Sequence, residues 1–97
     1  MHKFKVGDVV RLKTVKELDE EYRSWRDNFW VTKSMEDRHL GKHVVIKSQE
    51  TLGIKSSPGY CIVEDVNEFV YFEELFIDPY EEIKAISMEF SFDDLIK

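Results

Sequence analysis

The chain is poor in the residues that cross-link or interrupt a fold. Its 97 residues include one cysteine, two prolines and four glycines. A single cysteine excludes an intramolecular disulfide and a zinc site built from several cysteines, and it favours a reducing compartment. No apolar run approaches the ~20 residues that span a bilayer, and residues 1–5 lack the apolar stretch of a signal peptide. We therefore expect one cytoplasmic globular domain.

Signatures of catalysis and of metal binding are also missing. His39 and His43 are four residues apart, but Gly41 interrupts any helix that would place them on one face. The carboxylates occur mainly as adjacent pairs, which point apart instead of converging as a catalytic dyad does. Cys61 lies in a strand pattern, and we expect a small buried hydrophobe there and not a nucleophile. We therefore expect a protein that is not an enzyme and that needs no metal or cofactor.

Charge is distributed unevenly along the chain, whose net charge is −6. Residues 1–48 carry 11 Lys and Arg against 8 Asp and Glu, whereas residues 49–97 carry 3 against 12. Residues 64–82 contain eight acidic residues and no Lys or Arg. This acidic segment is either a surface that steers a partner or a solvated face that keeps the protein in solution. Its candidate partner-binding residues are Glu64, Asp65, Glu68, Glu73, Glu74 and Asp78.

β-Branched residues that alternate with polar ones predict a set of short strands. The expected strands cover residues 8–13, 42–48, 60–64, 69–72 and 76–78. Val10 and Leu12 share one face of the first strand, and Val44 and Ile46 share one face of the second. Residues 50–59 are polar and rich in turn formers, so we expect a mobile hairpin loop. A single turn of 3₁₀ helix is expected at residues 73–75.

A helix is predicted between the first two strands. Thr14 and Glu17 form a capping box. Apolar residues then recur at alternating spacings of three and four, which predicts one helix over residues 15–28. They are Val15, Leu18, Tyr22, Trp25 and Phe29. A shorter helical turn is expected over residues 34–40, capped by Ser34 and ended by Gly41.

Two aromatic residues depart from the expected core pattern. Trp30 breaks the helical spacing, and Tyr71 stands near the end of a predicted strand. We expect both to be partly exposed and to form a platform for a partner. The apolar residues of segment 81–97 fit a helix and a strand equally well, and we expect this extension to dock on the domain or on a partner.

Four short motifs, taken in order, carry a resemblance to a known family. The residues are Phe4-Lys5-Val6-Gly7-Asp8-Val9-Val10-Arg11-Leu12, then Met35 through His39-Leu40-Gly41-Lys42-His43-Val44-Val45-Ile46, then Tyr60-Cys61-Ile62-Val63-Glu64-Asp65 and Phe69-Val70-Tyr71-Phe72-Glu73-Glu74-Leu75-Phe76. The pattern resembles the small SH3-like β-barrel domains of short bacterial and phage proteins. The resemblance implies a mainly β, five-stranded barrel over residues 1–80, with the helix at about 15–28 inserted. It departs from the family in the long helix and in Phe69 and Tyr71, where tryptophans are common.

The resemblance implies an interaction role, and it carries no catalytic residues to transfer. We expect a non-catalytic module that binds a host or partner protein through its acidic and aromatic surface, with no membrane partner. One alternative is a phage-encoded inhibitor of a host defence nuclease, of the anti-CRISPR kind, whose carboxylates imitate nucleic-acid phosphates. Another is a barrel that binds nucleic acid directly. Its basic residues would be Arg11, Lys13, Lys42 and Lys47.

Overall fold

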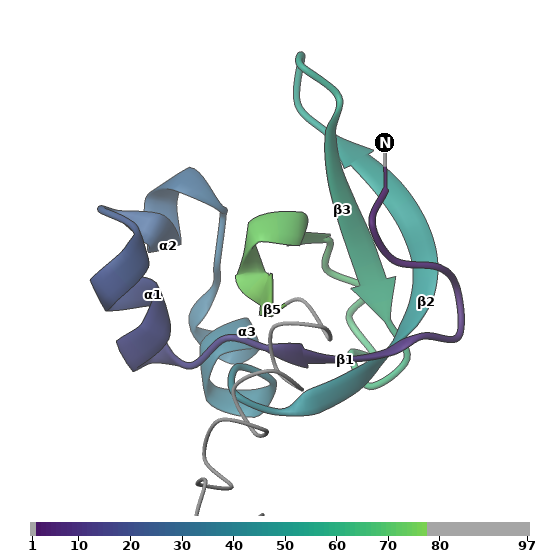
Figure 1. The fold of residues 1–97 in the computed structure, drawn as a ribbon, viewed down its shortest axis with the longest axis horizontal. Coiled ribbons are helices and arrows are strands. Elements are labelled where there is room, and N and C mark those ends of the chain that lie inside the picture. The colour runs from purple at the N-terminus through teal and green to yellow at the C-terminus, as the bar shows by residue number, and fades with distance from the viewer. Residues whose placement is uncertain (1, 78–97) are drawn as a thin grey trace, which may run out of the picture.

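The computed structural model describes residues 2–77, so Asp78 and the predicted extension 81–97 lie outside the described residues. The chain forms an antiparallel five-stranded sheet with short helices between the first two strands (Figure 1). The elements are β1 (Val9–Leu12), α1 (Val15–Glu21), α2 (Trp25–Asn28), α3 (Lys33–Arg38), β2 (His43–Leu52), β3 (Ser57–Ile62), β4 (Tyr71–Phe72), the 3₁₀ turn η1 (Glu73–Leu75) and β5 (Phe76–Ile77). The predicted mainly β fold with inserted helical segments is confirmed at this level.

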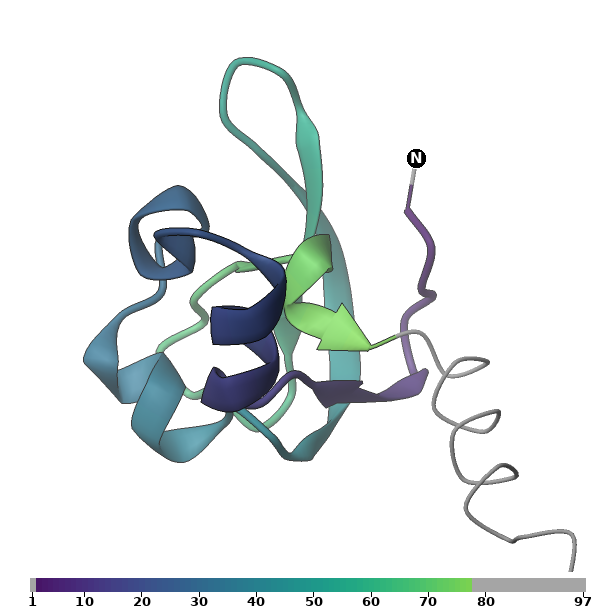
Figure 2. The ribbon, with the colours of Figure 1, turned by 60° about the vertical axis from the view of Figure 1, so that its left-hand side comes forward.

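The strand order in the sheet is β4-β3-β2-β1-β5. β1 therefore pairs on one edge with β2, where Val10 lies opposite Val44, and on the other with β5, where Leu12 lies opposite Phe76. β4 and β5 are the two outer strands, and the sheet is not closed into a barrel. The β2–β3 hairpin is the longest pair and projects beyond the short helices (Figure 2).

The prediction of one continuous helix over residues 15–28 is wrong. α1 ends where Tyr22 takes an extended conformation, and Ser24 then adopts a left-handed φ of 49° before α2 begins. The indole of Trp25 donates a 2.7 Å hydrogen bond to Asp19 across this break. Leu18 in α1 and Trp25 in α2 are both buried in the core, so the two short helices still share one apolar stripe despite the break.

Three further boundaries differ from the sequence predictions. α3 is capped by the side chain of Thr32, which accepts from the amide of Met35 at 3.2 Å, and not by Ser34. The predicted loop over residues 50–59 is mostly strand, since cross-strand pairing continues to Leu52 and Ser57. One face of an antiparallel hairpin can be polar and solvated, so polar residues there do not signal a loop. β4 is also shorter than predicted, with two residues only.

The core lies between the inner face of the sheet and the helices. The residues predicted to point inward, Val10, Leu12, Val44 and Ile46, are all at most 1% exposed. The N-terminal segment adds Phe4, which is 3% exposed and packs on the rings of Tyr60 and Phe76. The amides of residues 3 and 4 both donate to the hydroxyl of Tyr60, which fastens this segment to β3.

Gly59 offers a direct test of packing beneath the hairpin. A Cβ atom at this position would lie 2.6 Å from Cδ1 of Leu52 and 3.0 Å from the carbonyl oxygen of Tyr71. Because the Leu52 side chain would have to shift and the backbone at Tyr71 would have to give by a few tenths of an ångström, Gly59→Ala is expected to lower the free energy of unfolding by about 1–3 kcal/mol. Urea denaturation measures this, with Thr51→Ala on the exposed side of the same hairpin as the control. A Gly59→Ala variant as stable as the control would contradict the packing described.

Candidate partner-binding groove

An apolar groove lies between the segment after α2 and the turn of the β2–β3 hairpin. Its volume is about 520 Å³. The lining residues are Asn28, Trp30, Leu52, Gly53, Ile54, Lys55, Ser57 and Phe72. Grooves with mostly apolar walls and a few polar groups are the usual form of a binding site. The groove is therefore the candidate site of the described chain.

Trp30 forms one wall and is 58% exposed. Its φ of 53° lies in the left-handed region, which a bulky residue rarely adopts. The amide of Val31 donates to the carbonyl of Arg26 at 2.9 Å, and this bond closes the turn that contains Trp30. The indole meets the ring of Phe72 edge-on, with ring centroids 5.2 Å apart. The surrounding structure thus keeps a large aromatic ring at the surface in a strained backbone conformation.

The hairpin turn forms the opposite wall. Gly53 and Ser56 have positive φ values of 71° and 52°, and the amide of Ser56 donates to the carbonyl of Gly53 at 3.2 Å. Between them, Ile54 is fully exposed. A Cβ on Gly53 would lie 4.0 Å from Cη2 of Trp30, so the turn approaches the indole closely. Exposed apolar residues gathered around a hollow in this way mark interaction sites.

Of the two predicted platform aromatics, only Trp30 lies at the groove. The prediction that Tyr71 is partly exposed is wrong, because its side chain is 0% exposed and its hydroxyl donates to Asp65 at 2.7 Å. Burial, followed by the neighbouring Asp65 carboxylate, raises the pKa of Tyr71. Asp65 is itself 2% exposed and also accepts from the amide of Asn67. Neither residue belongs to the surface, and Phe72, the next residue along β4, lines the groove instead.

The other acidic candidates that the structure describes are mostly bonded within the domain. Glu64 accepts from the amide of Val45 at 3.0 Å, and Glu68 forms an ion pair with Lys47. Glu73 accepts from the hydroxyl of Tyr60 and from a main-chain amide at residue 3. Burial and then this glutamate raise the pKa of Tyr60 to about 12. The carboxylates therefore order the loops of the sheet, and Glu74 is the described member without such a bond.

The basic residues named for nucleic-acid binding are largely paired as well. Arg11 forms two hydrogen bonds with Glu17, at 2.8 and 2.9 Å, and Lys13 lies 2.9 Å from Glu21. The pKa of Glu17 is lowered to about 2, mainly by its hydrogen bonds with the Arg11 guanidinium. Lys47 is the partner of Glu68. These pairs leave Lys42 as the member of the set with no ion pair to another described residue.

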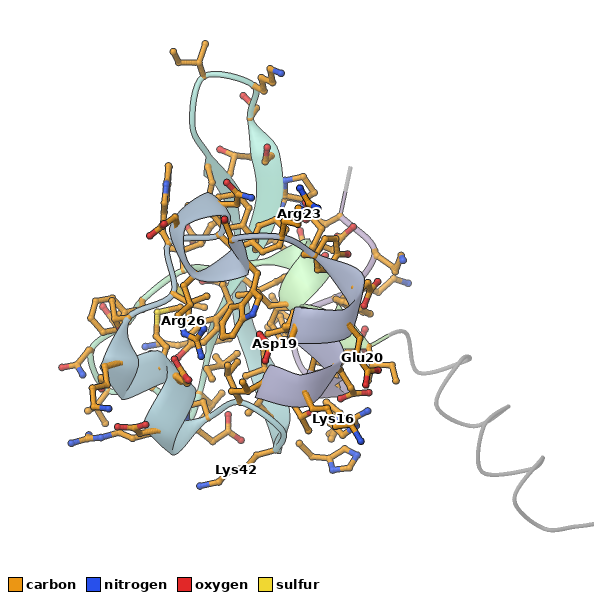
Figure 3. All side chains as sticks on the ribbon, turned by 90° about the vertical axis from the view of Figure 1, so that its left-hand side faces the viewer. Lys16, Asp19, Glu20, Arg23, Arg26 and Lys42 are labelled. Carbon is orange, nitrogen blue, oxygen red and sulfur yellow. The ribbon has the colours of Figure 1, made fainter. Side chains whose placement is uncertain are left out.

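The surface of the helices mixes both signs of charge. Figure 3 shows Lys16, Arg23 and Lys42 beside Asp19 and Glu20 on this side of the molecule. Arg26, in α2, forms two hydrogen bonds with Glu36 in α3 and stacks over a core indole. The helical insertion therefore presents neither a continuous acidic surface nor a continuous basic one.

The fold and the groove together define a small α+β domain with an exposed apolar groove beside a projecting hairpin. No family model matches the chain, and neither the curated proteins nor the solved structures yielded a match. Within residues 2–77, no helix is long and apolar enough to cross a membrane. The same part of the chain contains no group of three or more His, Cys, Asp or Glu placed to hold a metal ion.

Proposed function

We propose that this protein is a non-catalytic interaction module that binds a segment of a partner protein in the groove between Trp30 and the hairpin turn. The observation that carries the proposal is the exposed indole of Trp30 at a φ of 53°. A left-handed conformation for a non-glycine residue costs about 1–3 kcal/mol, and such strain clusters at functional sites. Tryptophan is also one of the three residue types, with tyrosine and arginine, that are enriched among those that dominate binding energy in protein interfaces.

An SH3-like architecture is part of the same proposal. Five short antiparallel strands in a single sheet, with β1 between β2 and β5, support it. The 3₁₀ turn η1 between β4 and β5 fits the order of motifs that carried the resemblance. SH3-like barrels bind extended segments in grooves lined by aromatic residues, as Trp30 and Phe72 line this one.

The two alternatives receive less support from the arrangement of charges. Imitation of nucleic-acid phosphates needs a set of free carboxylates at the surface, whereas Asp65 is buried, and the exposed Glu64 and half-buried Glu73 already accept hydrogen bonds within the domain. Direct nucleic-acid binding needs a groove in which several cations follow the backbone beside exposed rings, whereas the described lining of this groove has a single cation, Lys55. Arg11 and Lys13 are also paired with glutamates of α1.

Trp30→Ala is expected to weaken partner binding by at least about 30-fold, which corresponds to the ~2 kcal/mol of an interface hot spot. The assay captures proteins from a lysate of the source organism with the tagged domain. The captured protein is then purified, and its affinity is measured by calorimetry.

Val66→Ala is the matched control, because Val66 is 82% exposed and lies outside the groove lining. Both variants should keep the wild-type free energy of unfolding to within about 0.5 kcal/mol, as expected of surface substitutions. Capture of the same protein with equal affinity by the wild type, Trp30→Ala and Val66→Ala would exclude the groove as the binding site.

A further inference from the structure

The charge in the groove is as informative as its apolar walls. Lys55, at the hairpin turn, is the one charged side chain among the described residues that line it. Asn28 and Ser57 supply the neutral polar groups of the lining. No described carboxylate lines the groove, although acidic residues outnumber basic ones by 20 to 14 in the whole chain.

Lys55 also differs from the basic residues that form ion pairs within the domain. Lys13, Arg26 and Lys47 each form an ion pair with a glutamate. The ammonium of Lys55 forms no hydrogen bond or ion pair with any residue between 2 and 77. Lys55 is exposed at the hairpin turn, so its ammonium is available to a carboxylate of a partner, and salt screens their attraction.

We propose that the groove binds an extended peptide segment with a bulky apolar side chain and an adjacent Asp or Glu, whose carboxylate pairs with Lys55. This inference rests on the proposed function and specifies the chemistry of the partner. The apolar side chain packs between Trp30 and Leu52, both of which line the groove. The carboxylate then neutralises the one cation of the lining, and complementary charge of this kind selects the partner.

A displayed library of random dodecapeptides tests the pairing. The peptides are fused through their C-termini, so a carboxylate can come only from a side chain. The library is selected against the wild type, Lys55→Glu, Trp30→Ala and Lys16→Glu. The last variant is the matched charge reversal, because Lys16 lies on α1, away from the groove lining (Figure 3).

The wild type and Lys16→Glu should both enrich peptides that place an Asp or Glu next to a bulky apolar residue. Lys55→Glu should enrich Lys or Arg at that position, and Trp30→Ala should enrich no sequence. Synthetic peptides from the selection should bind Lys55→Glu at least about tenfold more weakly than the wild type, and this difference should shrink in high salt.

The outcomes separate this inference from the proposed function. Enrichment that requires Trp30 but shows no acidic preference, or that is unchanged in Lys55→Glu, overturns the carboxylate pairing and leaves the interaction module intact. No enrichment by the wild type overturns both. Light scattering supplies the remaining outcome, because a wild-type dimer that Ile54→Asp dissociates would assign the groove to a second copy of this chain.

Discussion

Replacement of Trp25 by alanine is expected to lower the free energy of unfolding by about 3–5 kcal/mol, the usual cost of removing a buried tryptophan. The side chain is 2% exposed, its indole donates to Asp19, and the guanidinium of Arg26 lies 4.1 Å from its ring centroid. The residue thus joins α1 to α2 across the left-handed Ser24. In a domain of this size the loss would remove a large share of the ~5–15 kcal/mol that holds it folded.

Urea denaturation followed by circular dichroism measures this loss. Trp25→Phe is the matched variant, because it keeps an aromatic ring in the core but removes the hydrogen bond to Asp19. We expect an intermediate loss for it. If Trp25→Ala costs less than about 1 kcal/mol, the helices do not form part of the cooperative core as described.

Tyr71→Phe is expected to lower the free energy of unfolding by about 2–3 kcal/mol without a change in shape. The substitution removes the 2.7 Å hydrogen bond to the buried Asp65, which then keeps only the amide of Asn67. A buried carboxylate that loses a donor retains the full cost of its desolvation. Within residues 2–77 every buried polar side-chain atom has a partner, so this variant would create the first exception.

A double-mutant cycle with Asp65→Ala isolates this bond, because the acceptor for the amide of Asn67 is lost with and without Tyr71→Phe, so that loss cancels. We expect a coupling energy of about 1–3 kcal/mol between positions 65 and 71. The raised pKa of Tyr71 adds a dependence on pH. The folded state keeps the phenolic proton longer than the unfolded state, so stability is complete below the ordinary tyrosine pKa of about 10 and falls as the pH rises above it. Additive single variants, or a Tyr71→Phe protein within about 0.5 kcal/mol of the wild type, would contradict this account.

The sequence was a good guide to which residues of the insertion face the core. The helical spacing correctly predicted that Leu18 and Trp25 are buried, yet it could not reveal the break in the helix between them. That break depends on the left-handed Ser24 and on a bond from Trp25 to Asp19, which only form together in the folded chain. Tertiary contacts of this kind override local periodicity.

The residues of the candidate groove were also predicted only in part. Trp30 was identified because it left the helical spacing, and it does lie at the surface. Tyr71 was assigned to the wrong side because β4 has two residues, which is too short for alternation to show which face is buried. The turn residue Ile54 went unnoticed, although an isolated isoleucine among turn formers has no strand neighbour to bury it.

The position of β1 between β2 and β5 has a consequence for synthesis on the ribosome. One edge of β1 can pair with β2 as soon as the middle of the chain has emerged. The other edge of β1 stays unpaired until β5 has been synthesised. The same holds for the amide of Lys13, which in the folded domain donates to the carbonyl of Leu75 at 2.8 Å. Contacts so distant in sequence form late and slow the folding reaction. The nascent chain therefore exposes an unpaired strand edge, the kind of surface on which chains aggregate, until nearly all of the described domain has been translated.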